Sequence, residues 1–381
     1  VGKTKGEASR LSNFVAQQLY DVAGKHPIAD VSLWSCGGRA RRQEIEKEGK
    51  VRSRLVLMPE MHSSQLKQIY SRRVTKKLQR INDCFENEIS LGTSLLYNGA
   101  ERIFKPFKKY NCVLEGDWSR FDNHVQERML VTAFGMLRSC FPAGKRIDNH
   151  FLHFCSGVVN KNIVTPGRYV YQVSKGLPSG DPFTSLLGTL INWLVWSTIL
   201  CQYHGLKDCQ RRATVAVYGD DTLVGLPDDF QIEEETFSTW IKEKCGLNLK
   251  DWKIGVPFSP NIHECKSFLK TRMVNGLPCM RVEDIVEDLA YPIKKAPHEW
   301  DKSFRVQSLN YVSPFNQDAL DIVEQYHFIL RYIALQGKCS EERLGKYMGA
   351  AYNFSLHWQA VLLFLFDDFK YITAAYSENQ L

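Results

Sequence analysis

The sequence predicts an α+β fold in which helices cover an antiparallel sheet. Short segments rich in β-branched and aromatic residues pair around turn residues, which is the pattern of β-hairpins. One long segment, residues 184–203, is apolar almost all round, as expected of a helix buried on every side. Strands and helices follow one another along the chain without a detectable repeat. This combination favours an antiparallel sheet with helices packed against it.

The first half of the chain supplies four predicted elements. Residues 62–90 have apolar side chains at helical spacing, and the helix that they predict presents Arg72, Arg73, Lys76 and Lys77. Three further segments follow in order: a short strand ending in an acid at 111–117, a helix at 123–141, and a hairpin at 161–173 about Pro166-Gly167.

The second half begins with the buried helix and continues with a hairpin at 214–226, where Gly219 supplies a permissive turn backbone. A helix at 231–245 comes next. A second hairpin at 265–281 has Asn275-Gly276 as its turn. The pattern is helical from about residue 317, and we expect the part after about 290 to form a separate subdomain.

The composition is that of an ordinary globular protein, with 44% hydrophobic and 24% charged residues in a chain of 381. The longest uninterrupted apolar runs, such as AVLLFLF at 360–366, are far short of the roughly 18 residues that span a bilayer, so we expect a soluble chain with no membrane segment. Eleven cysteines without a CxxC pair indicate reduced thiols in a cytosol-like compartment. The chain starts at Val1 without a secretory leader, and we expect it to be part of a longer protein.

Positive charge is concentrated in the N-terminal fifth of the chain. The net charge is +7, but residues 1–80 contain seventeen Lys and Arg against seven Asp and Glu, a balance of +10. Such a block attracts phosphates and predicts a polyanion as partner, with salt-dependent affinity. In RRQEIEKEGK the charge signs alternate, so there a solvated helix face is an equally good interpretation.

The sequence AVYGDDTLV at 216–224 places Asp220 and Asp221 together between apolar strands. Adjacent carboxylates repel each other, and a desolvated charge is unfavourable unless a positive group is near, so a bound cation explains the pair best. In GLPDDF, Asp228 and Asp229 are better explained as a solvated turn, because no β-branched strand follows them.

A second acidic segment, LEGDWSRFD, contains Asp117 at the end of a strand and Asp122 five residues later. Strand-end carboxylates from neighbouring strands could converge with Asp220 on one volume. Nucleotidyl transfer needs this arrangement, because two Mg²⁺ ions about 3.5–4 Å apart activate the attacking hydroxyl and stabilise the leaving oxygen. Mg²⁺ keeps waters and binds substrate phosphates, so two or three protein acids suffice.

Three segments in this order, GDWSRFD at 116–122, GLPSGDPFTSLLGTLIN at 176–192 and YGDD at 218–221, resemble motifs A, B and C of viral RNA-dependent RNA polymerases. The subgroup most similar is that of partitivirus-like and related small RNA viruses. Weaker similarities extend over about residues 50–292: KVRSRLVLMPE resembles motif F, FSTWIKEKCGLNLKDWK motif D, and the 265–281 hairpin motif E. The resemblance implies a right-hand polymerase with an antiparallel-sheet palm, partial fingers and a helical thumb.

The resemblance assigns roles residue by residue. Asp117 and Asp220 would be the metal ligands, and Asp221 an accessory acid at the second ion. The cofactor would be Mg²⁺, with Mn²⁺ as an alternative. Asp122 would sense the ribose 2′-hydroxyl, the group that distinguishes RNA from DNA building blocks. Three motif B residues would help it: Ser179, Thr184 and Asn192.

Further roles concern the loop and the incoming triphosphate. Gly180 would let the motif B loop flex during translocation. Three basic residues would line the nucleotide entry channel: Lys50, Arg52 and Arg54. Lys253 would protonate the leaving pyrophosphate, with Lys250 as a near competitor. Many positive-strand viral polymerases have asparagine where this chain has Gly188, which leaves the ribose partner open.

The implied domains are partial fingers with motif F at 1–110, a palm with motifs A to E at 111–285, and a thumb at 286–381. The palm would include a fingers insertion near 140–175. The implied partners are template and product RNA, ribonucleoside triphosphates and other viral proteins. The implied location is the host cytoplasm, in a viral replication complex or virion.

Three alternatives remain on the sequence alone. Reverse transcriptases share a Tyr-x-Asp-Asp hairpin, but they typically have a bulky aromatic residue where this chain has Asp122. A non-catalytic basic RNA-binding protein would explain the positive block but not the acidic hairpin. Two His/Cys groups raise the thought of zinc, although neither has a complete ligand set at recognised spacing: His263, Cys265 and Cys279, and His150, His153 and Cys155.

Overall fold

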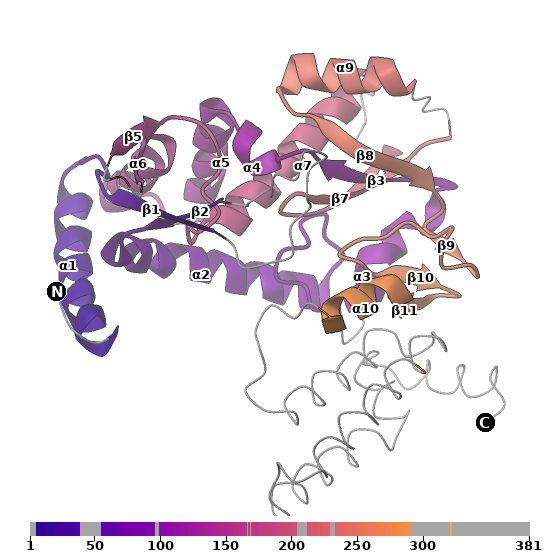
Figure 1. Cartoon of the computed structure of the whole chain (residues 1–381), viewed down its shortest axis with the longest axis horizontal. Helices are drawn as coiled ribbons and strands as arrows, with labels where there is room; N and C mark the ends of the chain where they lie inside the picture. Colours follow the sequence, from indigo (N-terminus) through magenta and orange to yellow (C-terminus); the bar gives the residue numbers. More distant parts are fainter. Residues whose placement is uncertain are drawn as a thin grey trace, which may run out of the picture. The chain divides into compact units, whose positions relative to one another are not determined.

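The computed structural model describes residues 5–38, 55–95, 99–165, 167, 169–203, 212–228, 233–290 and 321 (Figure 1). The chain divides into two compact units. One unit comprises residues 1–92 and 115–253, and the other comprises residues 93–114 and 254–381. The domain boundaries expected from the resemblance follow family motifs instead, and they stay a prediction.

A small mixed sheet and three helices form one side of the first unit. The strands have the order β2-β1-β4-β5, with β1 and β4 parallel and the other pairs antiparallel. Helix α1 packs against α2 and α6. The bounds are α1 (Lys5–Lys25), β1 (Leu33–Gly38), β2 (Leu55–Pro59), α2 (Met61–Cys84), α6 (Lys145–Val159), β4 (Lys161–Val164) and β5 (Val170–Val173).

A second four-stranded sheet has the order β6-β7-β3-β8 (Figure 1). Helix α7 packs against β6, and α5 and α9 pack against α7. The bounds are β3 (Cys112–Trp118), α4 (Phe121–His124), α5 (Glu127–Ser139), α7 (Thr184–Tyr203), β6 (Thr214–Tyr218), β7 (Asp221–Leu226), α9 (Glu234–Cys245) and β8 (Leu249–Gly255).

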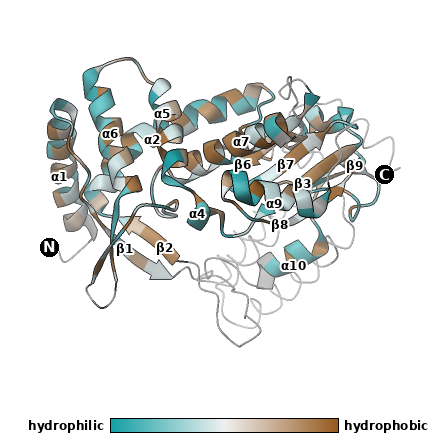
Figure 2. Cartoon of the chain, turned by 90° about the horizontal axis from the view of Figure 1, so that it is seen from above, coloured by the Kyte–Doolittle hydropathy of each residue, from teal (hydrophilic) through white to brown (hydrophobic). Residues whose placement is uncertain are grey.

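Helix α7 is the central core helix of this unit. Figure 2 shows it largely in the hydrophobic colour. Its window Thr184–Gln202 is long and apolar enough to cross a membrane, but 61% of that window is buried inside the protein, as in a core helix. The expectation of no membrane segment was based on uninterrupted apolar runs. It did not anticipate a helix that is long and apolar enough, by length and composition, to cross a membrane.

The second unit contains short elements around a β-hairpin. Strands β10 and β11 pair antiparallel about Asn275 and Gly276, whose φ angles of 50° and 80° are those of a type I′ turn. The bounds are α3 (Gly99–Phe104), the 3-10 helix η1 (Lys105–Lys109), β9 (Phe258–Ser259), β10 (Arg272–Val274), β11 (Leu277–Cys279) and α10 (Val282–Ala290).

The predicted α+β class and all three hairpins are confirmed. The helix predicted from residue 123 begins at Glu127, because α4 forms a separate turn before it. Several elements were not predicted, among them α1, β1, β2 and α6. Strand β1 pairs with β4, from which it is separated in sequence by about a third of the chain. Local sequence patterns do not reveal such a distant pairing. The predicted helical remainder lies outside the described residues apart from residue 321, and the predicted thumb apart from residues 286–290 and 321.

Eight of the described cysteines are free, while Cys201 is disulfide-bonded. The expectation of reduced thiols throughout is therefore wrong at this position. Spacing and count could not show it, because a disulfide depends on which cysteines the fold brings together.

Candidate active site

The candidate active site is built on the hairpin that carries the two neighbouring acids. Tyr218 and Asp221 are paired across β6 and β7, so Gly219 and Asp220 form a two-residue turn. Gly219 has a φ of 61°, a left-handed backbone that glycine adopts without strain. Asp220 and Asp221 are exposed, whereas residues 222–226 behind them are buried. The hairpin therefore presents two carboxylates from a buried strand pair.

Helix α7 fixes the backbone of this turn through two buried polar side chains. The Thr189 hydroxyl accepts the Gly219 N–H at 2.8 Å, and the Asn192 amide donates to the Gly219 carbonyl at 2.9 Å. The Asn192 amide nitrogen also lies 2.8 Å from the Thr222 hydroxyl, and its oxygen accepts from the Trp118 indole at 3.0 Å. One asparagine thus connects α7, the acidic hairpin and β3.

Strand β3 brings further carboxylates to the turn. It is hydrogen-bonded to β7 in the sheet, and Asp117 is exposed near its end. Burial raises the pKa of Asp221 to about 7, and repulsion from Asp220, Asp117 and Glu115 acts in the same direction. The Asp221 side chain keeps contact with solvent, so the desolvation comes from the protein around the turn. The fold therefore brings these carboxylates within electrostatic reach of Asp221.

Asp122 lies in a segment that is hydrogen-bonded to the start of the loop at 176–183. Arg120, with a φ of 51°, lies immediately before the one-turn helix α4 that contains Asp122. The Asp122 carbonyl accepts the Leu177 N–H at 2.7 Å. The Val125 carbonyl, just after α4, accepts the Gly176 N–H at 2.8 Å. Predicted motifs A and B are therefore adjacent in space.

The tip of the 176–183 loop contacts strand β2 directly. The Ser179 hydroxyl donates to the Leu55 carbonyl at 3.2 Å. A Cβ atom at Gly180 would lie only 2.3 Å from the Leu57 carbonyl oxygen, so glycine is required for this close approach. The sequence interpretation of Gly180 as a flexible hinge is not tested, but the structure supplies a steric reason for glycine.

Thr184 and Asn192 have positioning roles in this structure. The Thr184 hydroxyl bonds to the carbonyls of Pro178 and Asp181 at the start of α7. Asn192 is 0% exposed, and its amide is engaged as described above. Donation from either side chain to a ribose would require these bonds to break. The ribose-binding role expected for them is not tested and stays a prediction, and Ser179 is the most exposed of the four residues assigned to ribose recognition.

The basic candidates are only partly described. Lys253 is exposed on β8, the strand next to β3. Its competitor Lys250 lies in the same strand. The three residues expected to bind the triphosphate lie outside the described residues: Lys50, Arg52 and Arg54.

The donor set at the turn suits a hard cation. All the converging side chains are carboxylates, the ligands that Mg²⁺ prefers, and burial and the neighbouring carboxylates oppose ionisation of Asp221 as long as no cation is near. Within the described ranges, no group of three or more His, Cys, Asp or Glu side chains is already arranged to hold a metal ion. A Mg²⁺ ion here would therefore take part of its ligands from water or substrate phosphates.

Sequence reasoning missed two residues of the site. Glu115 is two positions before Asp117, so strand periodicity places both on one face of the sheet. Thr189 is one helical turn before Asn192, which made it a candidate for the same face of α7. Neither position has a distinctive motif signal, and only the fold shows that Gly219 lies against Thr189.

Solved structures share this fold. The chain is similar to the crystal structure of the RNA-dependent RNA polymerase of a human picorbirnavirus, with a TM-score of 0.63 and 15% identity. That match covers 87% of this chain and 64% of the other. The fold is thus that of a right-hand viral polymerase, as the sequence predicted.

Curated relatives point to the same group. The chain is 27% identical over 235 residues to a replicase polyprotein of Cricket paralysis virus, covering 55% of this chain and 13% of that protein. It is 26% identical over 235 residues to an RNA-directed RNA polymerase of Cryptosporidium parvum virus 1, covering 59% of this chain and 41% of that protein. The family described as viral RNA-dependent RNA polymerase matches residues 4–332.

The chain belongs to the viral RNA-dependent RNA polymerase family. The resemblance stated from motifs A, B and C is therefore confirmed. The closer affinity to partitivirus-like viruses stays a prediction. The chain spans well under two thirds of the length of the curated relatives described above.

Proposed function

We propose that this protein catalyses template-directed RNA synthesis, adding ribonucleoside triphosphates to an RNA 3′-hydroxyl with release of pyrophosphate. The observation that carries this proposal is the convergence of Asp117, Asp220 and Asp221 beside the Asp122 segment and the 176–183 loop. Membership of the polymerase family supports the same activity. The raised pKa of Asp221 is the expected sign of a crowded carboxylate site.

Asp117 and Asp220 would hold Mg²⁺, or Mn²⁺ as an alternative, with Asp221 as an accessory ligand. When bound, such ions activate the attacking hydroxyl and stabilise the leaving oxygen. The chain's own contribution is positioning: Thr189 and Asn192 fix the Gly219 turn that carries Asp220. Holding ligands in place before the substrate arrives reduces the reorganisation needed during reaction.

Asp122 is the candidate for recognising the ribose. A carboxylate accepts a hydrogen bond from a 2′-hydroxyl and gains nothing from a deoxyribose. The loop beside it has Ser179 at its tip, and the side chain of Ser179 is exposed. Lys253 would supply a proton to the pyrophosphate as it leaves, an assignment that rests on the resemblance to motif D.

Substitution of the hairpin acid tests the activity. Asp220→Asn should reduce RNA synthesis about 10²–10³-fold or more, the range seen when one catalytic electrostatic group is removed. RNA binding should stay within twofold. The matched control is Asp228→Asn, an exposed acid beyond β7, which should keep synthesis near the wild-type level. Unchanged synthesis by Asp220→Asn would favour a non-catalytic RNA-binding protein instead.

Substrate choice separates this proposal from a reverse transcriptase. On an RNA template the wild-type protein should incorporate ribonucleotides in preference to deoxyribonucleotides. Asp122→Ala should reduce that preference, because the 2′-hydroxyl loses its acceptor. A wild-type preference for deoxyribonucleotides would reject RNA synthesis as the function.

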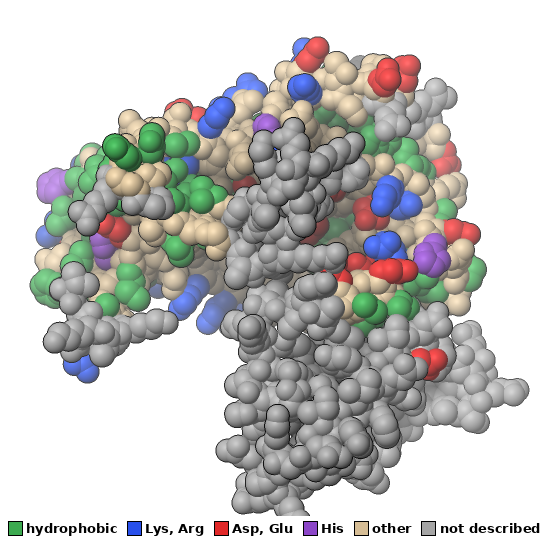
Figure 3. All heavy atoms as spheres, in the orientation of Figure 1, with side chains coloured by type: hydrophobic (Ala, Val, Ile, Leu, Met, Phe, Trp, Pro, Cys, Tyr) green, Lys and Arg blue, Asp and Glu red, His purple; other side chains and the backbone are tan. Residues whose placement is uncertain are grey.

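The exposed face of α2 supports a role in holding RNA. Figure 3 shows Lys and Arg side chains along the lower edge of this helix. Five exposed cations follow one another at alternating intervals of one and three residues: Arg72, Arg73, Lys76, Lys77 and Arg80. Charges four residues apart, such as Arg72 and Lys76, therefore lie about 6 Å apart along the axis. Among the described residues none of the five forms an ion pair. We propose that this basic stripe contacts RNA phosphates.

Neutralising part of the stripe tests this contact. The double variant Arg72→Gln/Lys76→Gln should weaken binding to single-stranded RNA and reduce the salt slope of the binding constant by about 1.4, at about 0.7 per lost phosphate contact on a single strand. The control is Lys242→Gln/Lys244→Gln at the exposed end of α9, with the same change of charge. Equal effects of the two double variants would mean that only net charge matters.

We further propose that the protein acts in the cytoplasm of a virus-infected host cell, in a replication complex or virion, as the motif resemblance implied. Fractionation of infected cells tests this location, and a nuclear location of the polymerase would contradict it.

A further inference from the structure

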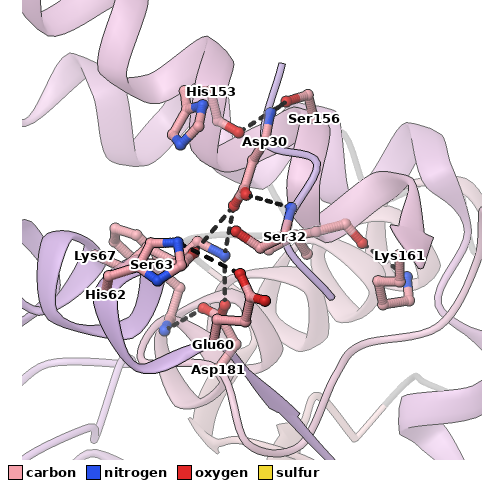
Figure 4. A network of polar contacts seen from close by, with 12 residues as sticks. Asp30, Ser32, Glu60, His62, Ser63, Lys67, His153, Ser156, Lys161 and Asp181 are labelled. Carbon is pink, nitrogen blue, oxygen red and sulfur yellow. Dashed lines mark hydrogen bonds and ion pairs between the residues drawn. The ribbon is translucent and has the colours of Figure 1, made fainter. Parts of the chain in front are cut away.

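A buried charge network connects helix α2 to the 176–183 loop. Lys67 of α2 is 0% exposed, and its Nζ lies 3.0 Å from Asp181 and 3.4 Å from Asp30. Figure 4 shows its amino group directed between the two carboxylates. Asp30 is held in turn by the Ser63 hydroxyl at 3.1 Å and the Ser32 N–H at 3.0 Å. The lysine thus has a carboxylate partner on each side.

Lys67 and Asp30 stay ionised in the protein interior because opposite charges lie next to them. Burial alone would lower the pKa of Lys67, but Asp181 and Asp30 outweigh burial, and the pKa is raised. Burial likewise opposes ionisation of Asp30, but Lys67, the hydrogen bonds from Ser32 and the nearby His153 together outweigh burial, so the Asp30 pKa is lowered. Both groups therefore stay charged at neutral pH, and the network does not act as a proton donor or acceptor.

Asp181 uses its two carboxylate oxygens for different partners. Oδ2 accepts from Lys67 at 3.0 Å, and Oδ1 accepts the backbone N–H of Phe183 at 2.8 Å. The Asp181 carbonyl also accepts the Thr184 N–H, which begins α7. A charge on α2 is therefore connected through one carboxylate to the junction between the loop and α7.

Strand β2 contacts the same loop from the segment just before α2. Ser179 and Gly180 lie against the backbone of β2, and Lys67 follows that strand by only two turns of helix. The β2-α2 segment therefore contacts three successive residues of the loop, two through its backbone and one through Lys67. At its other end the loop is bonded to the Asp122 segment.

We propose that the Lys67-Asp181 ion pair is a positioning device that sets the conformation of the 176–183 loop for binding the incoming nucleotide. The inference rests on the proposed function, because it assigns a regulatory contact to the same site. Lys67 and Asp181 are buried and would not touch the nucleotide. They act through Ser179 and Gly180, which lie between the ion pair and the segment that carries Asp122.

The position of the ion pair predicts which kinetic constant depends on it. The carboxylates of the hairpin are held by α7 through Thr189 and Asn192, without a bond to Asp181. Loosening the loop should therefore weaken nucleotide binding, seen as a higher KM, and leave the chemical step and kcat nearly unchanged.

Substitution of each of the two carboxylate partners of Lys67 in turn provides a matched test. Asp181→Asn keeps an acceptor for the Phe183 N–H but removes the charge on the loop, and Lys67 retains Asp30. Asp30→Asn removes the other charge of the network, and Lys67 retains Asp181. Both variants lose one ion pair of the same buried lysine, so both should be destabilised to a similar degree. Only Asp181→Asn changes the loop.

In RNA synthesis by the full chain, Asp181→Asn should raise the KM for ribonucleotides about tenfold with kcat within twofold of wild type. Asp30→Asn should keep the KM within twofold. Equal KM values in the two variants, whether raised or normal, would overturn the proposal, since a purely structural role predicts parallel effects.

Hydrogen exchange separates failure of this inference from failure of the proposed function. The amides of Leu177, Phe183 and Thr184 are hydrogen-bonded in the loop or at its ends. They should exchange at least tenfold faster in Asp181→Asn than in Asp30→Asn, whether or not the protein synthesises RNA. Equal exchange in the two variants would reject the positioning role. A wild-type protein without synthesis but with this difference would reject only the proposed activity.

Discussion

Two clusters of charged side chains in the first unit differ in how their charges are compensated. Around Lys67, opposite charges are buried together and satisfy each other through ion pairs of 3.0 and 3.4 Å. Around Asp221, like charges gather at an exposed turn, and burial together with their repulsion raises the pKa of the central carboxyl to about 7. One cluster is complete within the protein, while the other has an excess of negative charge.

This difference indicates what each cluster does. Buried ion pairs contribute little net stability, but removing one partner leaves an uncompensated charge that is strongly unfavourable. A cluster of like charges has the reverse property, because removing one charge relieves repulsion unless a ligand needs it. The Lys67 network is complete without a ligand, whereas the Asp221 cluster is the place where we propose that a cation binds.

The largest expected effect separates the two clusters by stability. Lys67→Met leaves Asp30 and Asp181 buried without their cation, and it should lower the free energy of unfolding by about 3–5 kcal/mol. Asp220→Asn, without divalent ions, should leave it unchanged or raise it by a few tenths of a kcal/mol. Urea denaturation measures both. A similar loss in the two variants would remove the distinction between the clusters.

A second effect tests how tightly the Lys67 network is packed. A Cβ atom at Gly157 of α6 would lie 2.4 Å from the Asp30 carboxylate, so Gly157→Ala should lower the free energy of unfolding by about 1–3 kcal/mol. The matched control is Gly135→Ala in α5, where no atom lies within 4 Å. That helix should become more stable by about 0.5–1 kcal/mol. Two variants with equal stability would contradict the close packing.

A third effect tests how the acidic hairpin is held. Thr189→Val keeps the shape of the side chain but leaves the Gly219 N–H without its acceptor, at an expected loss of about 1–3 kcal/mol. Synthesis should also fall, because the turn carrying Asp220 loses a constraint. Thr198→Val in the same helix removes only a bond to a backbone carbonyl of α7 and serves as control. Normal synthesis by Thr189→Val would show that the turn needs no support from Thr189.

A fourth effect, which appears only at alkaline pH, concerns Lys161, which is buried near the network. Burial lowers its pKa to about 8, so above pH 8 the folded protein releases a proton that the unfolded chain, with an ordinary lysine pKa near 10.5, still holds. The unfolded state then binds more protons, and stability due to this group rises with pH by at most about 1.4 kcal/mol per unit. The free energy of unfolding of wild type minus that of Lys161→Met should increase between pH 8 and 10. A flat difference would mean that Lys161 titrates normally.

The two clusters also differ in how far the sequence predicted them. Asp117, Asp220 and Asp221 could be selected because motif order and strand-turn patterning are local signals. The Lys67 network has no such signal, since it joins residues 30, 67 and 181 from distant parts of the chain. A lysine at an apolar helix position was interpreted only as part of a basic N-terminal block. Burial of a charge becomes visible only when its partners are placed by the fold.

The roles of Thr184 and Asn192 illustrate the same limit. Both were expected to contact the ribose, because their motif has that role in the family. The structure engages Thr184 with loop carbonyls and buries Asn192 under the acidic hairpin. A motif identifies which residues belong to the site, but the hydrogen bonds of this chain decide which of them are accessible.

Binding of Mn²⁺ to the purified protein tests the central claim most directly, because it does not require synthesis. Asp117→Asn and Asp220→Asn should each weaken Mn²⁺ binding at least tenfold, while Asp228→Asn should bind as wild type does. Magnetic resonance of free Mn²⁺ gives the affinities. If Asp117→Asn and Asp220→Asn bound Mn²⁺ as tightly as wild type, the carboxylates of β3 and the hairpin would not share a cation, and the account would be wrong.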